Sequence, residues 1–439
     1  MFSALAFIDS TPIAVGLILL VSAIALGSKV SVERLMVLAI GFPITVTWET
    51  TFSFNLAYLF AAAVFLQHAY WEPLTKIQPT KKTFLLLIFI LSFVVANGAG
   101  LLMSSPLESF STYIGFLKLL ASVFLATTIS RVFAKADKRM QRLLLTTWVQ
   151  GASFTAILTI SAYLAQSIFG GSPLDRLIFI QWRAMGFFQD PNLFAFFLLV
   201  SAGFLSALIL ERFTLRTSMH ALPIFMALGL ANSRAAFFGC VGAAAFLLFA
   251  LLWNRLTMLA ALVYIASGTV LVAIVNVVTP RLQPSPKTTT FEIGPIEIES
   301  NLRVGVAGDQ RFERWSRALS FFPEHPFFGV GLGQVENQVP LGSGSSSLAG
   351  TPHNTYVTLL LEVGLVGVIF WATIAVAILA CLLGAQSIKP RALSATLVGA
   401  AIFCLAFDIF SSATLWGLVG VGAGVALRAV NGAGKPEIN

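Results

Sequence analysis

The sequence has few charged residues. Asp, Glu, Lys and Arg together make up 10% of its 439 positions, against about 25% in an ordinary globular protein. Hydrophobic residues make up 57%, which excludes a typical water-soluble domain. The apolar runs also lack the alternating pattern of a transmembrane barrel. We therefore predict an all-α integral membrane protein, in which each helix satisfies its own backbone groups.

Cysteine and histidine are scarce, with three and four residues respectively. Cys240, Cys381 and Cys404 lie in apolar runs without CxxC spacing, which excludes a disulfide framework. We expect no metal and no cofactor, because histidines and carboxylates are not grouped at ligand spacing. Walker A, GxSxG and Rossmann motifs are missing as well. The N-terminus lacks the basic region of a secretory signal, so we expect the first apolar run to remain as a span.

Apolar windows of about 15 to 25 residues mark the candidate membrane spans. They cover residues 12–27, 34–48, 52–67, 83–103, 112–131, 143–169, 192–210, 218–231, 234–253, 256–278, 354–384, 392–407 and 411–427. The short windows 34–48 and 218–231 are the weakest, because a kinked or re-entrant segment gives the same pattern. The sequence predicts a polytopic helical bundle of about 12 (12–14) transmembrane helices.

Basic residues indicate the orientation. Seventeen fall in one set of alternate loops, whereas the short loops opposite hold only Arg176, Arg183 and Arg234. By the positive-inside rule the first set is cytoplasmic, and the long segment 279–353 lies outside near the C-terminal end. The chain thus divides into a bundle at 1–278, an outer loop at 279–353 and C-terminal spans at 354–439. Its net charge of +8 indicates contact with anionic lipid head groups rather than with nucleic acid.

The outer loop contains two recognisable patterns. RLQPSPKTTTFEIGPIEIES predicts an extended stretch or a short hairpin. DQRFERWSRALSFF places Phe312, Trp315, Leu319 and Phe322 on one helical face, with Arg311 among the flanking arginines, which is typical of a helix in the membrane interface. Pro323 is expected to end this helix, and a glycine- and serine-rich loop then leads to the span at 354.

Two arginines next to predicted helix starts are the first candidates for chemistry, since charges at the edges of spans are costly. In WRAMGFFQDPN, Asp190 reads as an N-cap and Pro191 as the first helical residue, a few positions after Arg183. In ANSRAAFFG, Ser233 caps a helix whose first turn contains Arg234. A bound phosphate or pyrophosphate would suit both arginines. Alternatively, Arg183 extends to the head groups, and Arg234 pairs with an outer carboxylate.

His353 is the third candidate. In TPHNTY we expect Thr351 to cap a helix, Pro352 to begin it and His353 to lie in its first turn. The helix dipole there favours a neutral imidazole, which can accept a proton from a hydroxyl nucleophile. A structural role for this histidine remains an alternative. Asp408 and Glu362, near the outer ends of the last spans, are weaker candidates that could act as counter-ions.

These motifs resemble a known family. RFERWSRALSFFPEHPFFGVGLGQ followed by TPHNTYVTLLLEVGLVGVIFW resembles the signature of the O-antigen ligase and O-antigen polymerase superfamily, and GFFQDPNLFAFF and NSRAAFFGCVGA match two upstream motifs in the same order. The resemblance covers about 180 to 375 well, and the first 140 residues only in topology. Where the family often has Asn-Pro-Asn, this chain has Asp190-Pro191-Asn192, which adds a negative charge near the expected anion site.

The resemblance implies a multi-pass enzyme of the bacterial inner membrane with a periplasmic active site. It implies transfer of a glycan from an undecaprenyl-diphosphate carrier to an acceptor hydroxyl, without a metal and with inversion. Arg183 and Arg234 would then bind the diphosphate, and His353 would act as base or orient the acceptor. Three further residues, Asn192, Asn354 and Arg311, are expected to bind the diphosphate or the glycan.

The acceptor stays open at this point. An O-antigen ligase of lipopolysaccharide biosynthesis uses lipid A-core and is the leading prediction, whereas a polymerase of O-antigen or exopolysaccharide uses another lipid-linked glycan. A protein hydroxyl is a third possibility. A secondary transporter is the alternative from a different class, although no internal repeat is visible and the charges gather at one face.

Overall fold

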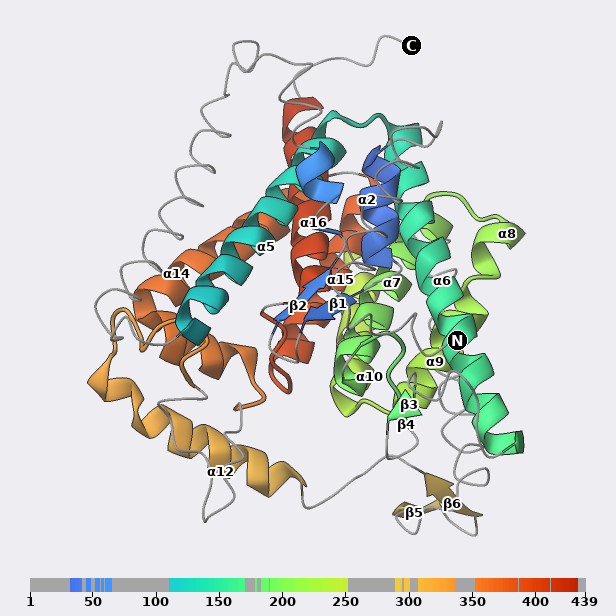
Figure 1. The fold of residues 1–439 in the computed structure, drawn as a ribbon. Coiled ribbons are helices and arrows are strands. Elements are labelled where there is room, and N and C mark those ends of the chain that lie inside the picture. The colour runs from blue at the N-terminus through green and yellow to red at the C-terminus, as the bar shows by residue number, and fades with distance from the viewer. Residues whose placement is uncertain are drawn as a thin grey trace.

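The computed structural model describes part of the chain (Figure 1). The described residues are 32–41, 45–48, 52–55, 57–58, 60–64, 110–169, 178–179, 183–188, 190–251, 289–293, 296–300, 307–335, 352–385, 387–410 and 412–432. Within them the fold is mostly helical. The helices are α2 (Val32–Gly41), α5 (Phe110–Lys135), α6 (Lys138–Phe169), α7 (Pro191–Glu211), α8 (Leu215–Ser218), α9 (Ala221–Ala231), α10 (Arg234–Ala250), α12 (Ala307–Ser320), η5 (Phe322–Glu324, a 3-10 helix), α14 (Thr355–Gly384), α15 (Ile388–Cys404) and α16 (Ala413–Gly432).

In the described part of the chain, three short antiparallel hairpins accompany the helices. They are formed by β1 (Thr45–Trp48) with β2 (Phe52–Asn55), β3 (Ile178–Phe179) with β4 (Arg183–Ala184), and β5 (Thr289–Ile293) with β6 (Ile296–Ser300). In the third hairpin Phe291 is paired with Ile298. The hairpin alternative for the start of the outer loop is therefore confirmed.

Four of the described helices are long and apolar enough to cross a membrane. They contain the segments Phe116–Lys135, Lys138–Phe169, Pro191–Glu211 and Thr355–Gly384. Shorter apolar helical segments lie at Leu215–Ala231, Arg234–Ala250 and Ala413–Ala429. The class of the fold, a helical membrane protein, is thus confirmed at this coarser level. The candidate spans 12–27, 83–103 and 256–278 lie outside the described residues, so the count of about twelve spans stays a prediction.

The two weakest candidate spans are not continuous helices. In the window 34–48 the helix ends at Gly41, and the segment from Thr45 is a strand. In the window 218–231 the helix α9 begins only at Ala221, after the short helix α8. Apolar composition marks both windows in the sequence, but neither supplies the length of a straight membrane span.

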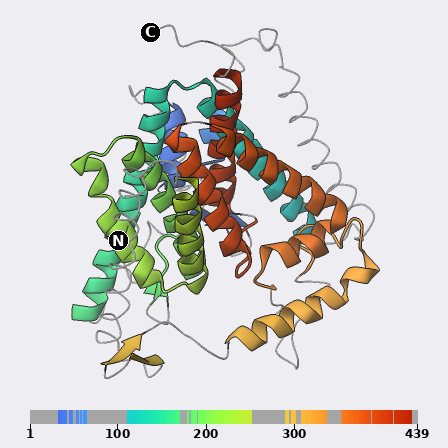
Figure 2. The ribbon, with the colours of Figure 1, turned by 180° about the vertical axis from the view of Figure 1, so that it is seen from behind.

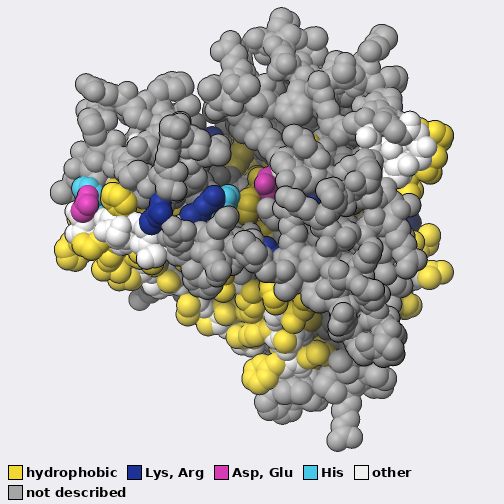
Figure 3. All heavy atoms as spheres, turned by 90° about the horizontal axis from the view of Figure 1, so that it is seen from below, with side chains coloured by type: hydrophobic (Ala, Val, Ile, Leu, Met, Phe, Trp, Pro, Cys, Tyr) yellow, Lys and Arg dark blue, Asp and Glu magenta, His cyan; other side chains and the backbone are white. Residues whose placement is uncertain are grey.

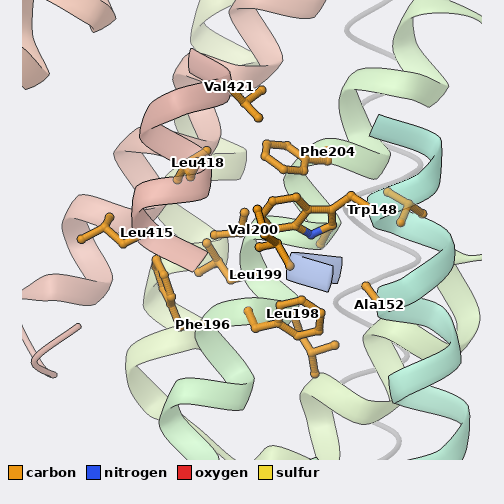
Figure 4. Close-up of a cluster of buried hydrophobic side chains, with 14 of the residues drawn as sticks. Trp148, Ala152, Phe196, Leu198, Leu199, Val200, Phe204, Leu415, Leu418 and Val421 are labelled. Carbon is orange, nitrogen blue, oxygen red and sulfur yellow. The ribbon is translucent and has the colours of Figure 1, made fainter. Parts of the chain in front are cut away.

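α7 lies at the centre of the described bundle. Its phenylalanines at 194, 196, 197 and 204 are fully buried, so the helix is apolar on every face and enclosed by its neighbours. Figure 4 shows this cluster between α6, α7 and α16. The Trp148 ring of α6 meets Phe204 edge to face at 4.9 Å, and its Nε1 donates to Ser201 Oγ at 3.0 Å. The one polar atom of the tryptophan is therefore satisfied inside the core.

Small residues allow other helices to approach closely, as is common where lipid removes the hydrophobic drive for association. A Cβ atom on Gly239 of α10 would lie 2.8 Å from the carbonyl oxygen of Gly399 in α15. The reverse contact, from Gly399 to the Gly239 oxygen, would be 2.7 Å. Gly420 and Gly424 of α16 lie as close to the α5 backbone. At these positions any larger side chain would separate the helices.

The bundle has two distinct ends. At one end the helices α6, α7 and α15 meet through Glu211, whose carboxylate oxygens lie 3.3 Å from Arg142 Nη1 and 2.8 Å from Lys389 Nζ. We call this the basic end. At the other end α12 runs beneath the start of α14, as Figures 1 and 2 show from opposite sides. We call this the α12 end. Residues predicted to be cytoplasmic and outer thus separate in space.

Candidate functional site

The start of α7 supplies the first part of the candidate site. Asp190 is its N-cap, with the carboxylate oxygen Oδ1 accepting from the backbone N–H of Asn192 at 2.6 Å, and Pro191 is its first residue. The predicted cap is therefore confirmed. Capping fixes the path of the chain into the helix and leaves the Asn192 side chain in the first turn, beside the residues that precede the helix.

The start of α10 supplies the second part. α9 ends at Asn232, which adopts the left-handed conformation with φ 47°, and Ser233 caps α10 by accepting from Ala236 N at 3.4 Å. Arg234 is the first residue of α10, as predicted. A cation there faces the positive end of the helix dipole. Within the described part of the chain, Arg234 forms no ion pair.

Asn192 connects these two helix starts to Arg183. The guanidinium of Arg183 donates from Nη2 to Asn192 Oδ1 at 3.1 Å and from Nε to the Ala231 carbonyl at 3.1 Å. Ser233 Oγ donates to the same Asn192 oxygen at 2.9 Å. The structure thus brings Arg183 beside the turn that leads into Arg234. Residues from β4, α7 and the α9–α10 turn form this group, which we call the arginine cluster.

The start of α14 differs from the prediction. Thr351 and Pro352 do not begin the helix, because Asn354 is the N-cap and Thr355 is the first residue. The Asn354 oxygen accepts from Tyr356 N at 3.0 Å and from Val357 N at 3.2 Å. An amide side chain is a stronger cap than the threonine considered from sequence. Asn354 is 4% exposed and its oxygen holds the helix start, while its role in binding the glycan stays a prediction.

His353 therefore precedes the cap instead of lying in the first turn. Its backbone is left-handed, with φ 53°, and its ring stacks on Phe407 at 5.7 Å between centroids with 19° between planes. Phe407 belongs to the link between α15 and α16. Thr355 Oγ1 donates to the Phe407 carbonyl at 2.8 Å and accepts from Ile409 N at 3.2 Å. The ring contact of His353 and the two hydrogen bonds of Thr355 thus hold this segment against the link.

His353 and Arg234 lie at the same end of the bundle. α10 and α15 are antiparallel: Gly239 near the start of α10 contacts Phe403 near the end of α15, while Leu247 at the other end of α10 clusters with Ala392. The end of α15 therefore lies beside the start of α10. Since the His353 ring stacks on the residue at 407, all three predicted catalytic residues come to the α12 end.

The position of α12 in the membrane interface stays a prediction, but part of its apolar stripe packs against protein. Trp315 Nε1 donates to the Pro352 carbonyl at 2.8 Å, and Trp315 and Phe322 pack against protein residues such as Val330. Leu319 is 40% exposed. The indole N–H needs an acceptor, which the segment before α14 provides. The side chains of Arg311 and Phe312 lie outside the described residues.

The two weaker carboxylates, Asp408 and Glu362, each accept a hydrogen bond from a backbone N–H group. Asp408 Oδ1 accepts from Phe410 N at 3.1 Å, and burial raises the pKa of this carboxyl. Glu362 Oε1 accepts from Gly333 N at 2.8 Å and so connects α14 to a glycine-rich loop. Sequence reasoning missed this role, although the spacing of glycines in GVGLG was a visible signal.

Figure 3 looks onto the α12 end and shows basic, acidic and histidine side chains beside apolar surface. The fold and these residues together indicate a class of protein. It is a helical membrane protein that has arginines close to two helix starts and a histidine at the same end of the bundle. Residues 219–372 match the family model described as O-antigen ligase. This part of the chain is therefore similar to the O-antigen ligase family, which confirms the resemblance seen in the motifs. The match includes Arg234 and His353. A search of curated proteins found no match.

Proposed function

We propose that the protein transfers a glycan from undecaprenyl diphosphate to an acceptor hydroxyl at the periplasmic face of the bacterial inner membrane. The preferred acceptor is lipid A-core, which would make the protein an O-antigen ligase of lipopolysaccharide biosynthesis. The supporting observation is the arginine cluster, in which Asn192 joins Arg183 to the turn before Arg234 at the same end as His353. The O-antigen ligase domain gives independent support.

The arginine cluster suits a lipid diphosphate. A guanidinium presents a planar fork of donors to phosphate oxygens, and the starts of α7 and α10 add N–H groups and the positive ends of two dipoles. The diphosphate gains negative charge as it leaves, and positive groups already in place stabilise that charge without reorganisation. In this mechanism the arginines perform the task that a metal ion performs in many sugar transferases.

His353 is the proposed base. A neutral imidazole can take the proton of the acceptor hydroxyl while the hydroxyl oxygen attacks the anomeric carbon. The new glycosidic bond forms, the bond from the anomeric carbon to the diphosphate oxygen breaks, and the carrier leaves with the electron pair. Attack opposite the leaving group inverts the anomeric configuration. Stacking of the imidazole on Phe407 holds its plane in one orientation, as such catalysis requires.

Reconstitution tests this proposal. Purified protein in liposomes is given a defined undecaprenyl-diphosphate oligosaccharide, with and without core lipid, and the products are identified by mass. Glycan on the core lipid supports a ligase. Longer lipid-linked glycans without core lipid would indicate the polymerase alternative. Movement of the glycan lipid across the membrane without transfer to either acceptor would overturn the proposal in favour of a transporter.

A further inference from the structure

α14 is broken in its third turn. Gly364 has φ 63° and ψ −172°, which is far from helical geometry. A break in a membrane helix leaves carbonyl and N–H groups without their usual partners, and lipid offers none. Such irregular backbone is stable only where other protein groups take over the hydrogen bonds.

Residues 326–331, which follow α12 and the 3-10 helix η5, supply these partners. Four backbone hydrogen bonds join the two segments: Val330 N to Leu361 O at 2.7 Å, Gly331 N to Glu362 O at 3.0 Å, Leu365 N to Pro326 O at 2.9 Å, and Val366 N to Phe327 O at 3.1 Å. The loop thus bonds to α14 on both sides of Gly364. The loop therefore supplies hydrogen-bond partners to the backbone groups on both sides of the break.

Glycines make this close approach possible. A Cβ atom on Gly329 would lie 2.4 Å from the carbonyl carbon of Glu362, and one on Gly364 would lie 2.3 Å from that of Phe327. Both glycines also have positive φ, 71° and 63°. The two backbones are therefore in direct contact, and side chains are excluded between them.

Glu362 adds a side-chain bond to this arrangement. Glu362 is 9% exposed, and its Oε1 accepts from Gly333 N at 2.8 Å, which fixes the far end of the loop. Val330 packs with Leu361 of α14 and with Ala318 of α12 in one buried cluster. α12, residues 321–335 and residues 355–363 therefore pack together, and we call them the α12–α14 unit.

His353 lies at the end of this unit. The unit holds it from two sides, because Trp315 of α12 donates to the carbonyl of Pro352, the preceding residue, and Asn354 caps the first turn of α14. We propose that Glu362 is a positioning residue for His353: by binding Gly333 it keeps the loop in the break of α14 and so fixes the unit that carries the histidine. This inference rests on the proposed role of His353.

Two variants separate hydrogen-bond reach from charge. Glu362→Gln keeps the length of the side chain and an oxygen acceptor but loses the charge, whereas Glu362→Asp keeps the charge and shortens the side chain by one methylene. We expect Glu362→Gln to retain at least about half of kcat and Glu362→Asp to lose about tenfold, with KM for the lipid donor unchanged within about twofold in both. Glu324→Ala, an exposed acid in the same segment, is the matched control and should behave as wild type.

Hydrogen exchange of the full-length protein in detergent gives a readout that does not need activity. The amides of Val330 and Gly331 should be protected in the wild type and in Glu362→Gln, and should exchange at least about tenfold faster in Glu362→Asp. If Glu362→Asp is more active and better protected than Glu362→Gln, the charge of the side chain is important and its length is not. The proposal is then overturned. A wild type that shows no glycan transfer while the amides are protected in the expected order would refute the proposed function and the role of Glu362 toward His353. The bond of Glu362 to the loop would still be established.

Discussion

The two halves of the candidate site are built differently. The arginine cluster is joined by side chains, with one Asn192 oxygen accepting from both Arg183 and Ser233. The α12–α14 unit around His353 is joined mainly by backbone hydrogen bonds across the break at Gly364. Side-chain substitutions should therefore change the chemistry of the first half, whereas the second half should be sensitive to glycine substitutions that disturb the backbone.

The largest effect should follow removal of an arginine. Arg234→Ala and Arg183→Ala are each expected to lower kcat/KM for transfer by about 100- to 1000-fold, because charge on the leaving diphosphate loses a preorganised partner. Lysine at either position should restore only part of the rate, since an ammonium lacks the planar fork. Transfer by purified protein in liposomes measures this. Wild-type rates in Arg234→Ala, with normal amounts in the membrane, would contradict the assignment.

Replacing the histidine should give the next effect. His353→Ala is expected to reduce kcat about 100-fold or more through loss of the base, while the affinity for the lipid donor stays near wild type because the arginine cluster is untouched. Donor binding and single-turnover transfer should be measured separately. Full activity in this variant would remove His353 from the mechanism.

Glycine substitutions test the backbone of the second half. Gly329→Ala and Gly364→Ala are expected to destabilise the protein by about 1–3 kcal/mol or more, because each requires positive φ and meets backbone atoms. Gly384→Ala is the matched control, since a Cβ there has nothing within 4 Å. The melting temperature in detergent reports the difference. Equal melting of all three variants would show that the loop does not need to lie in the break.

Asn192 tests how tightly the first half is joined. Asn192→Ala should raise KM for the lipid donor about tenfold, because a hydrogen bond to a charged group is worth roughly 1.5–3 kcal/mol and Arg183 loses one. Ser233→Ala, which removes a cap and one bond to the same oxygen, should have a smaller effect. Ser206→Ala, whose hydroxyl bonds only within its own helix, is the control. An unchanged KM in Asn192→Ala would show that this residue does not orient Arg183.

The smallest effect concerns Asp408 in the link that supports His353. Burial raises the pKa of this carboxyl above its unfolded value of about 3.9, so the unfolded chain ionises first as the pH rises. Wild-type stability should therefore fall from about pH 4 upward until the folded pKa is passed. Asp408→Asn should not show this loss, and the difference in melting temperature should grow with pH. A constant difference would contradict the inference.

Local features of the site were predictable from sequence, and contacts between distant segments were not. The caps Asp190 and Ser233 were predicted correctly because capping depends on neighbouring residues. The bonds of Asn192 to Arg183 and Ser233 connect separate segments, which no local pattern reveals. At the start of α14 the sequence analysis named only Thr351 as the cap, whereas Asn354, three residues later, caps the helix.

The break in α14 was invisible for a related reason. Apart from Glu362, LEVGLVGVIFW is apolar, so a hydropathy window treats it as one span. Three glycines with positive φ, at 329, 331 and 333, lie in a loop that the sequence marks only as flexible. The contact of this loop with the backbone around Gly364 depends on tertiary packing. The apolar stripe of α12 was likewise assigned to lipid, because sequence does not show which protein surface lies nearby.

The break in α14 also changes how the protein can respond to its bilayer. A span that does not match the local membrane thickness tilts, and an unbroken helix transmits this tilt along its whole length. In α14 the part after residue 366 is largely exposed, whereas residues 355–363 are bonded to the loop and to the α15–α16 link. We therefore expect tilting of the exposed part not to displace His353, so that its position relative to the arginine cluster is the same in membranes of different thickness.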